Sequence, residues 1–433
     1  MNLVERDKRH IWHPLTQHQL KPESLPIVKA KGALLFDEQG NKYIDGIASW
    51  YTSMYGHCNE HILEKVTQQM QLLDQIVFAG FTHEPAIELS ERLIKILPSN
   101  QQKVFFSDNG STANEVALKM AIQYHYNKGE KRQTIIALED GFHGDTFGAM
   151  SASGLSVYNG PFEDFFIDVV RIPVPNADNI QSVLQQLSSI FREKKVAAFI
   201  YEPLVQGANC MTMFESSYLE QVINSCKDNN VICIADEVMT GFGKTGKNFA
   251  SEYLSTQPDI ICLSKALTAG FVPMAITSCT TEIYNAFLSD SVATAFFHAH
   301  TYTANPIACT AALAGLDLLE SDAIQSNIQL IIKSHKNFDK KLKELPLYDS
   351  VVASTRQLGV IYALDLKVEM DRYGDKRNQI FKFFMDRGVC LRPLGKTIYI
   401  LPPFVILKEE LNKVHQVIIE LLEDFHSTDS SNT

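Results

Sequence analysis

Lys265 is the side chain of this sequence best placed for covalent chemistry. It comes just after the expected strand 259–263, and it is the only charged residue between positions 260 and 281. Burial disfavours the charged form of an amine, so the pKa of a lysine in such a stretch falls. A neutral amine can attack an aldehyde to form a Schiff base. The alternative is a lysine that reaches the surface from a strand end.

Asp236 ends a second expected strand, residues 231–235, and both strands are expected to end at the same edge of a sheet. A buried carboxylate needs a cationic partner. The protonated ring nitrogen of a pyridine-type cofactor is one candidate, because the pair keeps the ring electron-withdrawing. The alternative is a helix N-cap at a strand-to-helix turn.

The turn at residues 107–112 (SDNGST) joins an expected strand to a helix start. Backbone N–H groups and the helix dipole at such a turn suit a phosphate group. Gly110 would let the backbone approach closely, and Ser111 would add a hydroxyl. Phe142, which follows the expected strand 134–138, could stack on a flat cofactor. A plain strand–helix turn and a core aromatic are the alternatives.

Motifs for nucleotide or metal binding are not supported by their surroundings in the sequence. Residues 241–246 fit G-x-G-x-x-G, but five residues separate them from the preceding strand and no Rossmann-type helix follows. A P-loop reading of the same stretch would need glycine where Val238 stands. The histidines lack metal-ligand spacing, so no metal site is expected.

Strand-like and helix-like segments alternate through the middle of the chain, which predicts a mainly parallel central sheet with helices on both faces. Ligands of such sheets lie beyond the carboxyl ends of the strands. Thr112 and Glu115 are expected to form a capping box, and Gly129 to end that helix. The expected strands are residues 103–106, 134–138, 168–172, 196–201, 231–235 and 259–263, and the expected helices are residues 112–128, 177–191 and 216–229.

The pattern changes after about residue 322. A long amphipathic helix at 324–344 precedes short strands at 360–366 and 397–401, which indicates a smaller α+β domain. Residues 1–50 look like short strands and turns that pack against it. We therefore expect a large domain at 51–322, a small domain at 323–425 and a disordered tail at 426–433.

The composition excludes several classes of protein. A length of 433 residues allows two or three domains, and the net charge of -11 argues against nucleic acid or an anionic membrane as partner. The eight cysteines form no C-x-x-C pair and are expected as buried thiols in a reducing compartment. Residues 1–20 do not resemble a signal peptide, and Lys265, Gly270 and Pro273 interrupt the apolar window 260–281, so no membrane span is expected. The chain is expected to be cytoplasmic.

Taken together and in this order, these motifs resemble those of the class-III aminotransferases, which use pyridoxal 5'-phosphate (PLP). The string at 234–246 (IADEVMTGFGKTG) is similar to that family's signature, and 263–267 (LSKAL) follows with Lys265 placed 29 residues after Asp236. The resemblance covers about residues 5–420. It implies a PLP-dependent transferase fold of type I, with PLP-dependent transamination as the activity.

The resemblance also implies roles for single residues. Lys265 would hold PLP as a Schiff base and shuttle a proton, and Asp236 would pair with the pyridine nitrogen. Gly110 and Ser111 would hold the phosphate, and Phe142 would cover the ring face. The family is homodimeric with composite sites. Thr301 is expected to reach the phosphate from the neighbouring subunit. His300 is also expected to bind the cofactor, whereas Ala299 and Phe142 are expected to bind the substrate.

Further motifs are similar to the branch of the family that aminates 8-amino-7-oxononanoate in biotin synthesis. They are residues 10–14 (HIWHP), 49–50 (SW), 142–150 (FHGDTFGAM), 205–207 (VQG) and 391–395 (LRPLG). In that branch Arg392 would bind the acid end of the substrate, with Trp50 and Leu15 also lining the pocket. The usual amino donor is S-adenosylmethionine, and some members use lysine.

Two positions separate this branch from relatives that act on ornithine-like amino acids. Those relatives carry an arginine where this chain has Tyr399, and a glutamate where it has Ala208. Leu15 and Phe142 stand where many members of the branch have tyrosine, and Ala299 where glycine is usual. The alternatives are a class-III ω-aminotransferase acting on a diamine or ω-amino acid, and a PLP-binding protein without turnover.

Overall fold

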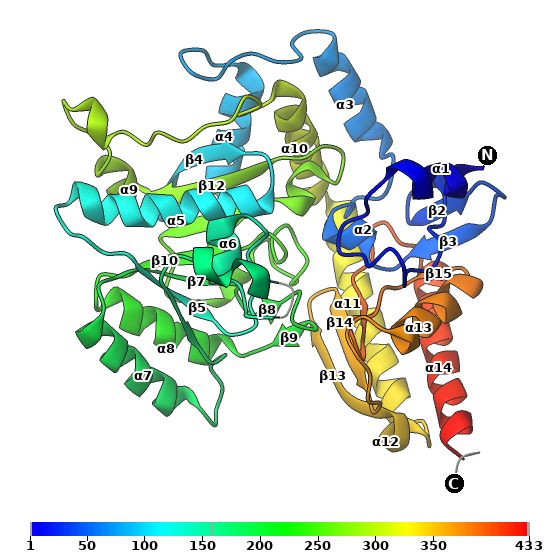
Figure 1. Cartoon of the computed structure of the whole chain (residues 1–433). Helices are drawn as coiled ribbons and strands as arrows, with labels where there is room; N and C mark the ends of the chain where they lie inside the picture. The colour runs from blue at the N-terminus through cyan, green and yellow to red at the C-terminus, as the bar shows by residue number, and fades with distance from the viewer. Residues whose placement is uncertain (1, 157–158, 431–433) are drawn as a thin grey trace.

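A computed structural model describes residues 2–156 and 159–430. Its centre is a seven-stranded sheet in the order β4-β12-β11-β10-β7-β5-β6, which forms one lobe in Figure 1. The bounds of these strands are β4 Gln101–Ser107, β5 Thr134–Leu138, β6 Val169–Ile172, β7 Val196–Tyr201, β10 Ile232–Asp236, β11 Ile260–Leu263 and β12 Ala275–Thr280.

The sheet is mainly parallel, as the sequence predicts. Strands β6, β5, β7, β10 and β11 pair in parallel, whereas β12 is antiparallel to both β11 and β4. The sequence analysis missed β12. Its centre carries the buried polar residues Thr277 and Ser278, and the Thr277 hydroxyl donates to the Ala113 carbonyl at 2.8 Å. Polar residues at the centre of a buried strand, one of them bonded to a neighbouring helix, therefore obscured the strand pattern.

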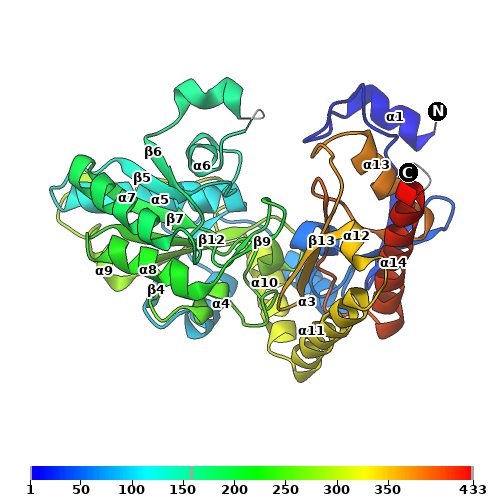
Figure 2. The ribbon, with the colours of Figure 1, turned by 90° about the horizontal axis from the view of Figure 1, so that it is seen from below.

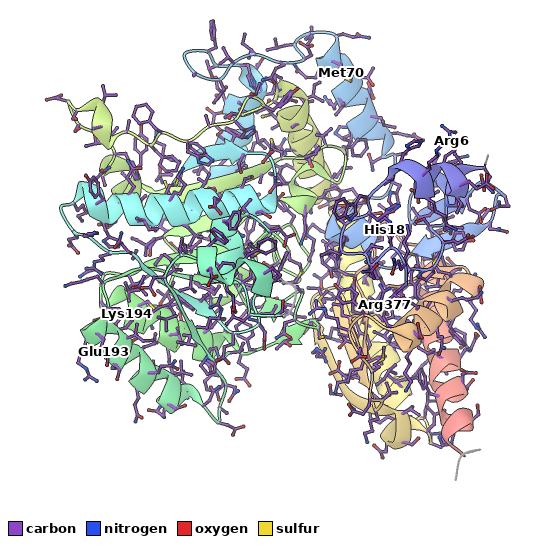
Figure 3. All side chains as sticks on the ribbon, in the orientation of Figure 1. Arg6, His18, Met70, Glu193, Lys194 and Arg377 are labelled. Atoms are coloured by element: carbon purple, nitrogen blue, oxygen red, sulfur yellow. The ribbon has the colours of Figure 1, made fainter. Side chains whose placement is uncertain are left out.

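The strands present alternate residues to two separate hydrophobic clusters, which explains the helices on both faces. In β10, Ile234 faces the cluster beneath α5 (Gly110–Asn127), and Cys233 faces the cluster that includes α7 (Ile180–Glu193) and α8 (Ser216–Lys227). Figure 2 shows α7 and α8 side by side on one flank of this lobe. Figure 3 labels Glu193 and Lys194, at the end of α7, on the outer side away from the smaller lobe.

The start of α5 differs from the prediction in one detail. The capping box joins Asn109 and Thr112, whereas Thr112 and Glu115 were expected. The Glu115 carboxylate instead accepts from Ala149 N at 2.9 Å and from the Thr146 hydroxyl at 2.7 Å. Because Glu115 is engaged with the next helix, it cannot reach back to a cap. Gly129 follows the helix with φ +80°, as expected for a helix stop.

The smaller lobe combines both ends of the chain. Strands β1 (Ile27–Lys31), β2 (Leu34–Asp37) and β3 (Lys42–Asp45) form a sheet with β15 (Val389–Cys390), so the N-terminal strands do pack against the C-terminal part. A second sheet is antiparallel, in the order β13-β14-β16. Its bounds and those of the flanking helices are β13 Val352–Leu358, β14 Ile361–Leu366, β16 Thr397–Ile400, α11 Asp322–Lys343, α12 Tyr348–Val351, α13 Asp375–Asp386 and α14 Lys408–Ser430.

Helix α14 extends to Ser430, so residues 426–430 are helical where a disordered tail was expected; residues 431–433 lie outside the described residues. The domain boundaries at 50, 322 and 425 remain predictions. The remaining elements are α1 Leu3–His10, α2 Ala48–Tyr51, α3 Glu60–Met70, α4 Glu84–Ile96, α6 Phe147–Ala152, α9 Thr281–Asn285, α10 Pro306–Leu319, β8 Val205–Gln206, β9 Thr212–Met213 and four short 3₁₀ segments, η1 Gly160–Phe165, η2 Ala250–Tyr253, η3 Lys265–Thr268 and η4 Val292–Thr294.

Across residues 2–156 and 159–430, the helices are all too short or too polar to span a bilayer. The same residues contain no group of three or more His, Cys, Asp or Glu side chains that could hold a metal ion.

A buried histidine pair joins α11 to α14 in the smaller lobe and predicts how stability depends on pH. His335 Nδ1 lies 3.0 Å from His415 Nε2, and the His415 ring stacks on Phe338. Burial lowers the pKa of His415 to about 3 and that of His335 well below its usual value. The unfolded chain therefore takes up protons first as the pH falls below about 6.5.

Because His415 stays neutral in the folded protein, we expect the free energy of unfolding to fall by about 2 kcal/mol between pH 7.5 and pH 5. Urea unfolding at the two pH values should show a smaller difference for His415→Gln, which keeps a hydrogen-bond acceptor. His10→Gln is the control, because His10 is exposed. An unchanged pH difference in His415→Gln would contradict the expectation.

Candidate active site

Asp236 and Lys265 lie at the same edge of the central sheet. Asp236 is the last residue of β10 and pairs with Cys262 of the parallel strand β11. Lys265 begins the 3₁₀ segment that follows β11. Burial lowers the pKa of the Lys265 amine, and the nearby Asp236 charge partly opposes that effect. The structure therefore places Asp236 and Lys265 at one edge of the sheet, as the sequence predicts.

The Asp236 carboxylate is buried and held by three donors. Oδ2 lies 2.7 Å from both His143 Nδ1 and Asn114 Nδ2, and Oδ1 accepts from Val238 N at 3.1 Å. The side chain is 3% exposed. Among the described residues, His143 Nε2 and Asn114 Oδ1 are buried without a hydrogen-bond partner. The network fixes the carboxylate and keeps it available to a cationic group in the site.

Lys265 is suited to react as a neutral amine. Burial is the largest influence on its pKa and lowers it, while Asp236 and Glu202 oppose that effect. Its Nζ lies 5.1 Å from the centre of the Tyr51 ring. Its backbone has φ +50°, a conformation that non-glycine residues adopt only where the surroundings impose it. The strain fixes the direction in which the amine leaves the sheet.

The start of α5 forms a tightly packed cradle beside Asp236. A β-carbon on Gly110 would come within 2.7 Å of Val238 Cγ1, and one on Gly144 within 2.2 Å of Ser111 Oγ. The Ser111 hydroxyl accepts from Asp145 N at 3.2 Å. The first N–H groups of a helix have no acceptor within that helix, so this end can bind a phosphate.

These residues fit PLP. The cradle supplies N–H groups and a hydroxyl for its phosphate, the buried carboxylate of Asp236 suits a protonated ring nitrogen, and Lys265 supplies the amine. Phe142 lies beside them and is 44% exposed, so its ring is free to cover a bound group. The role of each residue toward PLP stays a prediction.

Trp50 and Tyr51 are presented by a left-handed turn. All four residues of α2, Ala48–Tyr51, have φ between +45° and +74°. The Asp45 carboxylate supports the turn: it accepts from Ser49 N at 2.7 Å and lies 2.8 Å from His57 Nε2. Such a run of strained non-glycine residues is costly and requires this support.

Arg392 faces this turn from the loop after β15. Its guanidinium carbon lies 4.8 Å from the centre of the Trp50 ring, which is a cation–π contact. No ion pair of Arg392 with a carboxylate occurs among the described residues. Tyr399 packs edge-on against Tyr51 with ring centres 5.8 Å apart. The guanidinium is therefore available to an acidic ligand.

Other predicted residues lie apart from this cluster. The Thr301 carbonyl accepts from Gln75 Nε2 at 2.8 Å, and His300 N donates to Thr303 Oγ1. His300 Nε2 is buried without a partner among the described residues. No described hydrogen bond joins His300 or Thr301 to the site of the same chain, and Ala299 lies in the same segment. Leu15 is 56% exposed. Their roles remain predictions.

The sequence analysis missed three polar residues of the site. His143 was within a quoted motif but had no assigned role, and Asn114 lies within the apolar pattern of α5. Glu202 directly follows the buried strand β7, just as Asp236 ends β10. A carboxylate at the end of a buried strand was therefore a signal that could have identified Glu202.

The chain matches the model of the family Aminotransferase class-III over residues 16–422. It is 42% identical to the adenosylmethionine-8-amino-7-oxononanoate aminotransferase of Synechococcus elongatus, with 96% of this chain and 99% of the relative covered. The enzyme of the same name from Helicobacter pylori is 35% identical, with 98% of each covered. The chain belongs to the class-III aminotransferase family.

Solved structures agree with this assignment. A crystal structure of the adenosylmethionine-8-amino-7-oxononanoate aminotransferase of Methanocaldococcus jannaschii superposes with a TM-score of 0.91 at 34% identity, covering 98% of each chain. A PLP-bound amine transaminase from an uncultivated Pseudomonas species gives 0.87 at 27% identity, covering 94% of this chain and 97% of that one. The fold is that of the PLP-dependent transaminases, and this protein is a PLP-dependent transaminase.

The left-handed turn yields a prediction. Asp45→Asn keeps the size of the side chain but removes the charge that holds Ser49 and His57. We expect KM for the amino acceptor to rise about tenfold, because hydrogen bonds to a charged group contribute about 1.5–3 kcal/mol. PLP affinity, measured by titration of the apoenzyme, should be unchanged. Asp37→Asn is the control, since Asp37 is equally buried but holds the β2–β3 turn. A similar rise in KM in both variants would contradict a local role for Asp45.

Proposed function

We propose that this transaminase converts 8-amino-7-oxononanoate to 7,8-diaminononanoate in biotin synthesis, with S-adenosylmethionine as the amino donor. One observation carries the proposal: the Arg392 guanidinium lies over the Trp50 ring. Among the described residues, this guanidinium forms no ion pair with a carboxylate. It suits the carboxylate end of this long substrate, because arginine binds carboxylates in bidentate fashion. Relatives that carry the name of this activity support the same substrate.

A tyrosine rather than an arginine at position 399 favours this substrate over ornithine-like amino acids. The Tyr399 ring is buried against Tyr51 and offers no positive charge for a second carboxylate. Ala208 likewise leaves out the glutamate that would mask an arginine there. The side chains at positions 399 and 208 therefore supply neither a cation for a second carboxylate nor a carboxylate to mask one.

PLP, when bound, supplies an electron sink for the substrate carbon that loses its proton. Asp236 would hold the ring nitrogen protonated, and it is fixed for this by His143 and Asn114. Gly110 and Ser111 would bind the phosphate, and Phe142 would cover one face of the ring and exclude water from it.

Lys265 Nζ would carry the proton between substrate and cofactor. That role needs an amine that can be neutral near pH 7, and burial lowers the pKa in that direction. The Tyr51 ring beside the amine keeps water away and limits the positions that Nζ can reach. The same lysine would hold PLP between turnovers.

The active unit would be a homodimer in the cytoplasm. His300 and Thr301 make no described contact with their own chain's site, which is consistent with their serving the site of a second copy, Thr301 at the phosphate. The surrounding segment exposes large apolar side chains, with Phe297 73% and Tyr302 65% exposed. A partner surface would remove these rings from water.

The substrates are tested by half-reactions. The enzyme in its yellow form is mixed with S-adenosylmethionine or lysine, and conversion to the pyridoxamine form is followed by absorbance. The pyridoxamine form is then offered 8-amino-7-oxononanoate, pyruvate or 2-oxoglutarate. We expect S-adenosylmethionine as donor and 8-amino-7-oxononanoate as acceptor. Preference for pyruvate with a diamine donor would instead indicate a general ω-aminotransferase. Binding of PLP with no half-reaction would indicate a non-catalytic binding protein.

The role of Lys265 is tested by Lys265→Ala. Transfer should fall at least about 10³-fold, because the proton carrier is lost, and the yellow absorbance should disappear. Added methylamine should restore part of the rate. The control is Lys247→Ala, which removes a lysine whose amine donates to the Glu252 carbonyl and lies over the Tyr253 ring. Retained turnover in Lys265→Ala would refute the assignment.

A further inference from the structure

Glu202 is a second buried carboxylate at the edge of the sheet that holds Asp236. It directly follows β7 and is 5% exposed. Its Oε1 accepts from Phe142 N at 3.0 Å, and its Oε2 accepts from Gly207 N at 3.0 Å. One side chain therefore joins the loop after β5 to the loop after β8.

Both loops lie against the cofactor residues. The first carries Phe142 and His143, and His143 bonds Asp236. In the second, a β-carbon on Gly207 would come within 3.0 Å of Met239, three residues after Asp236. The position of Phe142 over a bound ring thus depends on a backbone N–H that points at Glu202.

The charged and titratable groups around Glu202 come from four elements. Burial is the main cause that raises its pKa, to about 7; Asp236 at the end of β10 raises it further, and His143 lowers it. The Lys265 amine of η3 and the Tyr51 hydroxyl of α2 also feel its charge. Both bound N–H groups favour the ionised form.

Only the ionised carboxylate can accept both N–H groups well. A protonated acid carries an O–H on one oxygen, so one N–H would face a donor rather than a charged acceptor. The loss of one charge-assisted hydrogen bond would loosen one of the two loops.

We propose that Glu202 is a positioning residue whose carboxylate, when ionised, fixes the Phe142 and Gly207 loops around the cofactor site. It acts through the backbone of Phe142 and does not touch the reacting atoms. The inference rests on the role given to Phe142 under the proposed function. The rate of amino transfer should therefore rise with pH over the range in which Glu202 ionises.

Amide hydrogen exchange of the PLP-bound enzyme tests this without a substrate. After correction for intrinsic rates, peptides covering residues 140–144 and 204–208 should lose about tenfold protection between pH 8 and pH 6 in the unmodified protein, since one charge-assisted hydrogen bond is lost. In Glu202→Gln the loss should already be present at pH 8. Glu139→Gln is the control, because Glu139 is exposed and bonds Gln206 through its carbonyl alone. Protection that does not change with pH would overturn the proposal, even if Glu202→Gln did not fold.

The second measurement is the pH profile of kcat/KM. Glu202→Gln should be about tenfold slower than the unmodified enzyme at pH 8 and nearly equal to it at pH 6. A ratio that stays constant between these pH values would assign Glu202 a merely structural role. The exchange result does not depend on which amino acceptor is used. If 8-amino-7-oxononanoate is not turned over, the exchange data still decide the role of Glu202.

Discussion

The structure depends on one constraint: a carboxylate that is kept from water must lie beside an amine that is also kept from water. Asp236 tolerates its burial because His143, Asn114 and Val238 donate to it. Those three residues come from the loop after β5, from α5 and from the end of β10. The sheet strands and α5 therefore all meet at the Asp236 carboxylate. A shift of any one of these elements would leave this buried charge without a hydrogen-bond donor.

The smaller lobe completes the site by supplying aromatic side chains from a strained backbone turn. The turn at Ala48–Tyr51 is left-handed throughout, and Asp45 stabilises it from the end of β3. β3 in turn pairs with β15, which leads to Arg392. The pairing of the two chain ends therefore sets the distance between Trp50 and Arg392. The N-terminal strands serve the substrate pocket as much as the stability of the fold.

The sequence predicted what apolar periodicity and strand ends can show. The parallel strands, the edge shared by Asp236 and Lys265, and the pairing of the N-terminal strands with the C-terminal part were foreseen. β12 was missed because buried polar residues interrupt its apolar pattern, with Thr277 bonding α5, and the capping box was misplaced because Glu115 bonds α6. The partners of Asp236 were missed because they lie 93 and 122 residues away in the sequence. Local patterns carry no signal for contacts that only tertiary packing creates.

The two carboxylates at this edge of the sheet, Asp236 and Glu202, are held by different donors. Asp236 has His143 and an amide side chain as donors, whereas Glu202 has two backbone N–H groups and lies close to the Asp236 charge. Burial and the nearby Asp236 charge raise the pKa of the Glu202 carboxyl to about 7, while His143 and the two N–H groups oppose that rise. Each negative charge also opposes the desolvation of Lys265. The pKa of the Lys265 amine is therefore set by its desolvation, which lowers it, together with two neighbouring carboxylates, which raise it.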